Sequence, residues 1–217
     1  MAVHVFVDNS NIFHGARRTA AKLEPTAHWM AVRVYYRHFF QLLEGEREVA
    51  TRVMAGSVPP GNEDLWDYAK QAHYETDLLR KVDTDEGHLS EQGVDELLHL
   101  KIANVLLDYE SPQDLVLATG DGSVSNFGTS FVQQVQRAVK RQWSVELWSW
   151  EQGLSPKLGA VRDAHSKLVA LSLLDPEYWK LTFIRGGSYT YKGVTTSCPS
   201  RQVQEMKAFN PAFGQQK

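Results

Sequence analysis

Val-His-Val-Phe-Val-Asp-Asn-Ser-Asn, residues 3–11, is the stretch that indicates the fold. Its first five residues are mostly β-branched or aromatic, which predicts a buried strand of a parallel sheet. The polar residues begin where this strand should end, and sites in open α/β sheets form at the carboxyl ends of strands. A carboxylate flanked by amides there suits a hydrated divalent metal ion or a phosphate-bearing substrate. A simpler interpretation makes Asp8 the N-cap of the next helix or part of an Asx-turn.

A second aspartate follows a second apolar strand. Residues 115–119 read Leu-Val-Leu-Ala-Thr, and the loop Gly-Asp-Gly-Ser follows at residues 120–123. Glycines on both sides of Asp121 allow backbone N–H groups and a ligand to approach closely. Two aspartates at strand ends indicate a site more strongly than either aspartate alone.

A third aspartate lies near the start of a predicted helix. Apolar residues recur at spacings of three and four along residues 92–107, which predicts a helix. Asp95 lies in its first turn, where the helix dipole favours a negative charge. That electrostatic effect is one explanation of Asp95, and a place beside Asp8 and Asp121 at the edge of the sheet is the other.

The three motifs together resemble the NYN-domain family of PIN-like ribonucleases, over roughly residues 3–175. In that family a strand leads into D-x-S-N, a helix opens K-G-V-D, and a second strand leads into S-G-D-S-D-F. The matching stretches here are residues 6–11, 92–95 and 119–123. The resemblance implies a PIN-like fold in which acidic residues bind Mg²⁺ or Mn²⁺ and the enzyme hydrolyses RNA phosphodiester bonds. By this resemblance Asp8, Asp95 and Asp121 are the candidate catalytic residues and metal ligands.

The sequence departs from the family pattern at two acidic positions. Ser123 stands where the family has a second aspartate in the loop, and Lys101 stands where its helix often has another. Ser123 or Asn126 could supply a neutral oxygen to a metal ion, and Lys101 could neutralise part of the acidic cluster. These departures predict weaker metal binding and leave an alternative open, a domain that binds RNA or a protein partner without cleaving.

Further candidates for substrate binding lie in or just after the motifs. The amides and the hydroxyl could orient ligands, substrate or water, and the arginines could contact phosphate, although a solvated helix face is the simpler interpretation of the arginines. The candidate substrate-binding residues are Asn9, Asn11, Ser123, Asn126, Arg17 and Arg18.

Composition sets limits on this interpretation. The 217 residues are 42% hydrophobic and carry a net charge of −3, which is ordinary for a globular protein and lacks the basic bias of dedicated nucleic-acid binders. RNA contact would therefore need a local basic patch. The single Cys198 excludes an intramolecular disulfide. We find no signal-peptide pattern and no apolar stretch approaching ~20 residues, so we expect a cytoplasmic or nuclear protein that does not bind membranes.

Strands and helices alternate along the chain, which predicts a Rossmann-like α/β fold with a mostly parallel sheet and helices on both faces. We expect one domain over residues 1–175 and a C-terminal extension over residues 176–217, folded as a hairpin or an extended arm. A protein partner or a second copy of the chain could use that extension together with a tryptophan-rich edge at Trp148 and Trp150. The predicted helices are 13–23, 28–43, 63–72, 92–107, 130–141 and 156–168. The predicted strands after the first are 49–57, 74–81, 115–119, 144–150 with one face exposed, and 169–174.

Overall fold

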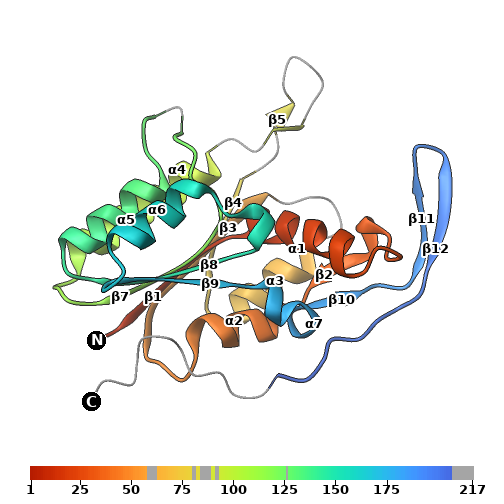
Figure 1. Ribbon diagram of the computed structural model, residues 1–217, viewed down its shortest axis with the longest axis horizontal. Helices are drawn as coiled ribbons and strands as arrows, with labels where there is room; N and C mark the ends of the chain where they lie inside the picture. The colour runs from red at the N-terminus through yellow and green to blue at the C-terminus, as the bar shows by residue number, and fades with distance from the viewer. Residues whose placement is uncertain (58–62, 80–81, 84–88, 91–92, 126, 207–217) are drawn as a thin grey trace.

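A six-stranded parallel sheet forms the centre of the protein, in the strand order β4-β3-β1-β7-β8-β9 (Figure 1). The computed structural model describes residues 1–57, 63–79, 82–83, 89–90, 93–125 and 127–206. From β1 the chain adds strands first on one side and then on the other, so the order reverses between β1 and β7. The strands of this sheet are β1 (Val3–Asp8), β3 (Val49–Ser57), β4 (Glu75–Leu79), β7 (Asp114–Ala118), β8 (Ser144–Ser149) and β9 (Val169–Leu173).

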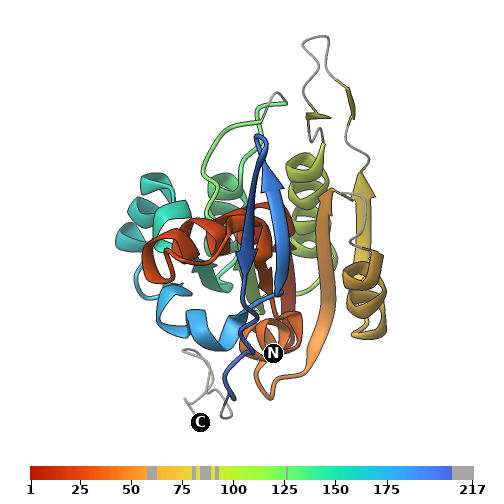
Figure 2. The same cartoon turned by 90° about the vertical axis from the view of Figure 1, so that its right-hand side faces the viewer.

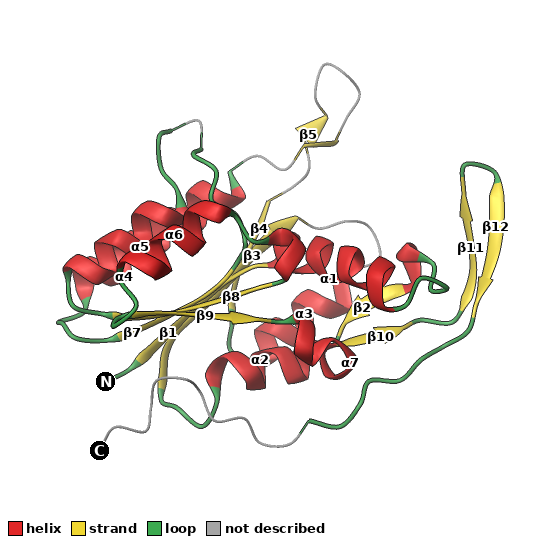
Figure 3. Cartoon of the chain, viewed as in Figure 1, coloured by secondary structure: helices red, strands yellow, loops and turns green. Residues whose placement is uncertain are grey.

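Helices cover both faces of the sheet, as Figure 3 shows. Successive residues of β1 point to opposite faces, so Phe6 packs in one core cluster while Val5 and Val7 pack in the other. The alternation places a complete hydrophobic layer on each side, which confirms the predicted Rossmann-like α/β class. One layer contains α4 (Val94–Asp108), α5 (Phe131–Lys140) and α6 (Pro156–Ala164), and the other contains α1 (Asn9–Leu23), α2 (Tyr36–Glu44), α3 (Glu63–Gln71) and α7 (Tyr178–Leu181).

The predicted helix over residues 28–43 is wrong in its first half. A 3₁₀ turn over Trp29–Ala31 leads into β2 (Val32–Val34), and α2 begins only at Tyr36. The strand forms because β2 pairs antiparallel with β10 (Thr182–Ile184), about 150 residues further along the chain. Sequence periodicity does not reveal a partner at that distance. The first helix also begins earlier than predicted, at Asn9, because Asp8 caps it.

The predicted exposed face of residues 144–150 is wrong as well. Every residue of β8 after Ser144 is buried, because β7 and β9 flank the strand and helices cover both faces. Glu146 is tolerated there because Arg47 Nη1 lies 2.6 Å from its Oε1. Trp148 and Trp150 are 2% and 1% exposed, so they belong to the core and do not form a partner surface.

The region after residue 175 begins inside the domain and then leaves it. Tyr178 and Leu181 of α7 are fully buried in the core. Beyond β10, the strands β11 (Gly187–Tyr191) and β12 (Val194–Cys198) form the predicted hairpin, which Figure 2 shows running past α1. The chain then returns to the domain, where Arg201 Nε donates to Glu24 Oε1 at 2.9 Å.

Four further short elements complete the described chain. The strands β5 (Val82–Asp83) and β6 (Leu89–Ser90) form a short antiparallel pair. Two more 3₁₀ turns cover Glu151–Gly153 and Asp175–Glu177. No helix in the described ranges has the length and apolar character needed to cross a membrane.

Stability should depend on the protonation of His4, which is fully buried against the rings of Tyr109 and Trp143. Burial lowers the pKa of His4 to about 4, against the opposing effect of Asp114, while an unfolded histidine titrates near 6.5. Between these values the unfolded chain binds more protons, so stability falls as the pH falls. Urea unfolding should show a loss of about 2 kcal/mol from pH 7 to pH 5 that is absent in His4→Phe.

The control is His165→Gln, because His165 is exposed at the end of α6. This variant should keep the pH dependence of the wild type. If His4→Phe kept the same loss, the acid sensitivity would come from other groups.

Candidate functional site

A cavity of about 300 Å³ opens at the carboxyl ends of β1 and β7, where the strand order reverses. Ligands in open α/β sheets bind at this position, because the loops after the two strands diverge to opposite faces and leave a crevice. The cavity is lined by Asp8, Ser10, Asn11, His14, Arg18, Gly93, Val94, Asp95, Glu96 and Asp121.

Asp8 lies at the base of the cavity and is only 3% exposed. Its Oδ1 accepts a hydrogen bond from Asn11 N at 3.0 Å, which makes Asp8 the N-cap of α1. Its Oδ2 accepts a hydrogen bond from the Thr119 hydroxyl at 2.8 Å, and the same hydroxyl accepts Asp121 N at 3.1 Å. The simpler interpretation of Asp8 as a cap is therefore confirmed, and the carboxylate still borders the cavity.

Asn11 ties α1 to the loop after β7. Its Oδ1 accepts a hydrogen bond from Gly120 N at 2.8 Å, and Gly120 O accepts one from Ser155 N at 2.8 Å. A Cβ atom on Gly120 would lie 2.2 Å from Gly153 O, so only glycine fits at this point of the loop. The close approach of three segments at Gly120 fixes where Asp121 stands.

Asp121 is held by its own loop. Its Oδ1 accepts a hydrogen bond from Ser123 N at 2.9 Å, and its Oδ2 accepts one from the Ser123 hydroxyl at 2.8 Å. This is the Asx-turn geometry expected of a short polar loop. Ser123 therefore contacts Asp121 but does not itself line the cavity.

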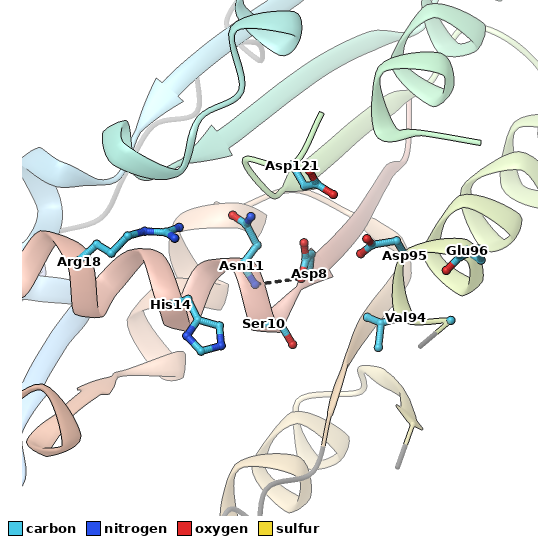
Figure 4. Close-up of a pocket in the computed structure, with 10 residues that line it drawn as sticks. Asp8, Ser10, Asn11, His14, Arg18, Val94, Asp95, Glu96 and Asp121 are labelled. Carbon is cyan, nitrogen blue, oxygen red and sulfur yellow. Dashed lines mark hydrogen bonds between the residues drawn. The ribbon is translucent and has the colours of Figure 1, made fainter. Parts of the chain in front are cut away.

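Asp95 reaches the cavity from α4. Gly93 precedes this helix with φ +86°, a conformation that favours glycine, and no side chain caps the helix. Asp95 and Glu96 occupy the first turn, where the helix dipole favours negative charge. Figure 4 shows the carboxylates of Asp8, Asp95 and Asp121 directed toward a common space from three different elements.

A stripe of α1 forms the opposite wall. Ser10, His14 and Arg18 follow one another at intervals of four residues and all line the cavity. Of these three, only Arg18 was predicted from the sequence as a site residue; Ser10, His14 and Glu96 of α4 were not. The i, i+4 spacing from Ser10 was the signal that could have found the first two.

Two of the predicted substrate-binding residues, Arg17 and Asn9, do not line the cavity. The Arg17 guanidinium lies over the rings of Phe13 and Trp29, at 4.0 and 4.9 Å from their centroids. Asn9 is buried on another side of α1, where its Oδ1 accepts a hydrogen bond from the Tyr36 hydroxyl. Asn126 falls outside the described residues.

Two further residues of α4, Lys101 and His99, have ionisable side chains but do not line the cavity. Lys101 forms an ion pair with Glu75 and is not among the residues that line the cavity. His99 is buried, with Nδ1 3.0 Å from Thr129 Oγ1. Burial lowers the pKa of His99, and nearby Glu96 and Asp121 only partly oppose that shift. His99 is thus a neutral core residue of α4.

The donor set fits a hydrated divalent ion better than a directly chelated one. Carboxylate oxygens are the ligands that Mg²⁺ and Mn²⁺ prefer, and Mg²⁺ keeps several waters while using one or two carboxylates. Within the described ranges, no group of three or more His, Cys, Asp or Glu side chains is arranged to hold a metal ion. Metal binding by Asp8, Asp95 and Asp121 therefore stays a prediction.

The fold and the crevice define an α/β protein of Rossmann-like architecture. Neither a protein-family model nor a curated protein matches the sequence. The chain is similar in structure to a crystallised protein of unknown function from Vibrio parahaemolyticus, with a TM-score of 0.57 and 16% sequence identity. The similarity covers 80% of this chain and 92% of the other. At this identity the likeness shows the fold alone.

The Thr119 hydroxyl should be important for the stability of the site. Thr119→Val keeps the shape of the side chain but leaves Asp8 Oδ2 without this donor and Asp121 N without this acceptor. Because both groups lie at a buried junction, we expect a loss of about 1–3 kcal/mol in the free energy of unfolding, measured by urea denaturation.

Thr190→Val is the matched control. Its hydroxyl lies 2.8 Å from that of Thr195 on the exposed hairpin, so its loss should change the stability by less than about 0.5 kcal/mol. Equal effects of the two variants would contradict the structural role assigned to Thr119.

Proposed function

We propose that the protein is a metal-dependent endoribonuclease that hydrolyses RNA phosphodiester bonds in the cavity at the ends of β1 and β7. One observation carries the proposal: the end of β1, the loop after β7 and the first turn of α4 each direct an aspartate into the same cavity. The resemblance of the three surrounding motifs to NYN-domain ribonucleases agrees with this arrangement.

Three carboxylates around one cavity repel one another, and a bound cation offsets that repulsion. Mg²⁺ or Mn²⁺, held by oxygens of Asp8, Asp95 and Asp121 directly or through water, would supply that positive charge. When bound, such an ion offsets the charge that develops on a phosphate and makes a water molecule a better nucleophile.

The residues of the chain itself would position the substrate. Arg18 can donate to two oxygens of one phosphate, which fixes both its place and its orientation. Asn11 is held by Gly120 N through its carbonyl oxygen, so its amide N–H₂ can donate to a phosphate oxygen. The exposed imidazole of His14 can give a proton to the leaving oxygen.

Binding without cleavage is the second candidate function. The lack of a ready metal-holding group in the described ranges favours it, as does the serine at position 123. In that case the protein would bind RNA or a protein partner, with the hairpin as a surface that a partner or a second copy could contact. The two functions differ in one measurable property, the release of shorter RNA.

The first test is cleavage of a labelled single-stranded RNA with Mn²⁺. We expect weak activity that a chelator removes, and at least ~10-fold less activity in Asp121→Asn, since a metal ligand is lost while the shape is kept. Asp108→Asn is the matched control, because Asp108 is an exposed aspartate at the far end of α4.

The three proteins should be compared at equal amounts of folded protein. Full activity in Asp108→Asn and low activity in Asp121→Asn would support the proposal. Equal activity in all three would point to a contaminating nuclease, and RNA binding with no cleavage at all would favour the second function.

The second test concerns Ser123. Ser123→Asp adds a charged oxygen beside Asp121 and removes a hydroxyl that donates to Asp121 Oδ2. Both changes should tighten Mn²⁺ binding several-fold in calorimetric titration, because hard cations prefer charged oxygens.

Ser123→Ala separates the two effects, since it removes the hydroxyl and adds no charge. We expect binding between that of the wild type and that of Ser123→Asp. Unchanged or weaker binding in Ser123→Asp would mean that this loop does not face the metal, and the match of residues 119–123 to the family motif would then fail.

A further inference from the structure

A second cavity, of about 600 Å³, lies on another side of α1. Ser10, His14 and Arg18 line the first cavity, which contains Asp8, Asp95 and Asp121 and is called the acidic cavity from here on. Asn9 and Phe13 line the second cavity. Residues four apart share one stripe of a helix, and neighbouring residues are turned by about 100°. The two cavities are therefore adjacent across the first turns of α1, and the consecutive residues Asp8 and Asn9 contribute one to each.

The second cavity is rich in arginine. Arg33 of β2, Arg37 of α2 and Arg185 after β10 all line it, together with the carboxylate of Asp64. Within the described ranges none of the three arginines forms an ion pair with a carboxylate. Three guanidinium groups and one carboxylate leave the lining with an excess of positive charge.

The arginines are also crowded. Burial lowers the pKa of Arg33, and the positive charge of Arg185 adds to that effect while Tyr189 opposes it. Burial and then Arg33 lower the pKa of Arg17, which does not itself line this cavity, to about 10. Like charges held this close favour the binding of an anion, because an anion removes their repulsion.

Aromatic rings line the same space. Tyr35 meets Phe183 edge to face, with ring centroids 6.3 Å apart, and Tyr68 stacks on Phe40 at 6.1 Å while staying 36% exposed. Bases of single-stranded nucleic acids stack on such rings, and arginine binds phosphate with two donors. A volume of this size is typical of pockets for small organic ligands.

We propose that this arginine pocket, defined by Arg33, Arg37, Arg185, Tyr35, Tyr68 and Phe183, binds one nucleotide unit of a single-stranded RNA whose adjacent phosphate lies in the acidic cavity. The base stacks on an aromatic ring and its phosphate contacts the arginines. The placement of the strand rests on the proposed nuclease function, whereas recognition of a nucleotide by the pocket does not.

The test measures binding in the presence of a chelator, so that no cleavage occurs. The probes are a fluorescent single-stranded RNA of about ten nucleotides, AMP, and inorganic phosphate. The double variant Arg37→Gln/Arg185→Gln removes two exposed cations. Arg33 is left unchanged because its Nη1 donates to Met30 O at 2.6 Å and to Val32 O at 2.9 Å.

The matched control removes the same charge from the other face of the sheet. Arg137→Gln/Lys140→Gln changes two exposed cations of α5. We expect the pocket variant to weaken RNA binding at least ~10-fold. It should also make the negative slope of log affinity against log salt shallower by about 0.7, the value for one phosphate of a single strand. The control variant should bind like the wild type.

Tyr68 tests base stacking separately from charge. Tyr68→Leu should weaken RNA binding by about 5-fold or more, and Tyr68→Phe, which keeps the ring, should retain it. Thermal melting of every variant shows whether it is folded. A folded pocket variant with unchanged RNA affinity would overturn the proposal.

The small probes identify the ligand. RNA bound more tightly than AMP, with both weakened by the pocket variants, is the expected result. AMP bound as tightly as RNA would assign the pocket to a free nucleotide and overturn the strand arrangement. Phosphate bound as tightly as AMP, with no effect of Tyr68→Leu, would mean an anion site without base recognition.

The experiments distinguish failure of the proposed nucleotide site from failure of the proposed nuclease activity. Wild-type protein that binds RNA through the pocket but never cleaves it with Mn²⁺ would remove the proposed function and keep the nucleotide site. Cleavage with RNA affinity unaffected by the pocket variants would keep the nuclease and remove the pocket.

Discussion

The buried carboxylate of Asp8 is the constraint on which the site depends. A charge that is 3% exposed must be compensated, and here the first turn of α1 and the Thr119 hydroxyl supply the hydrogen bonds. The first contact fixes where α1 begins. The second draws the end of β7 to the end of β1 and, through Asp121 N, sets the start of the loop that carries the second carboxylate. One buried group thus contacts both α1 and the loop after β7, and together with the contacts of Gly120 it positions these two walls of the crevice.

Because Asp8 fixes where α1 begins, it also fixes the rotation of that helix about its axis and so the direction in which each side chain points. A helix that starts at Asn9 directs His14 and Arg18 into the acidic cavity and turns Phe13 toward the arginine pocket. Shifting the start by one residue would turn every side chain by about 100°. A helix predicted to begin only at residue 13 does not show which of its side chains face the end of β1. Arg17 and Arg18 were therefore equivalent candidates from the sequence, whereas only Arg18 lines the acidic cavity.

Local patterns were sufficient for most of the sheet. The strands at residues 49–57 and 115–119 lie inside the sheet and the strand at 169–174 lies at its edge, and their composition and short length identify all three without any knowledge of their partners. The three aspartates followed from the same reasoning, since each stands at the end of a strand or the start of a helix. What local patterns could not supply was contact between distant segments. The pairing of β2 with β10, the burial of both faces of β8, and the role of Thr119 all depend on residues more than 90 positions away or on packing from both sides.

Under the proposed function, the separation of the acidic cavity from the arginine pocket would explain how a chain with a net charge of −3 binds RNA. An acidic cavity alone repels RNA, and a cation bound there can offset only part of that repulsion. The arginine pocket lies on the neighbouring stripe of α1. RNA would therefore be attracted by the arginine pocket and cleaved in the adjacent acidic cavity. Screening limits electrostatic attraction to about 8 Å at physiological salt, which is the scale of one or two nucleotides and of the first turns of α1. Under the proposed function, a local patch of this extent would hold the strand without a basic bias in the overall composition.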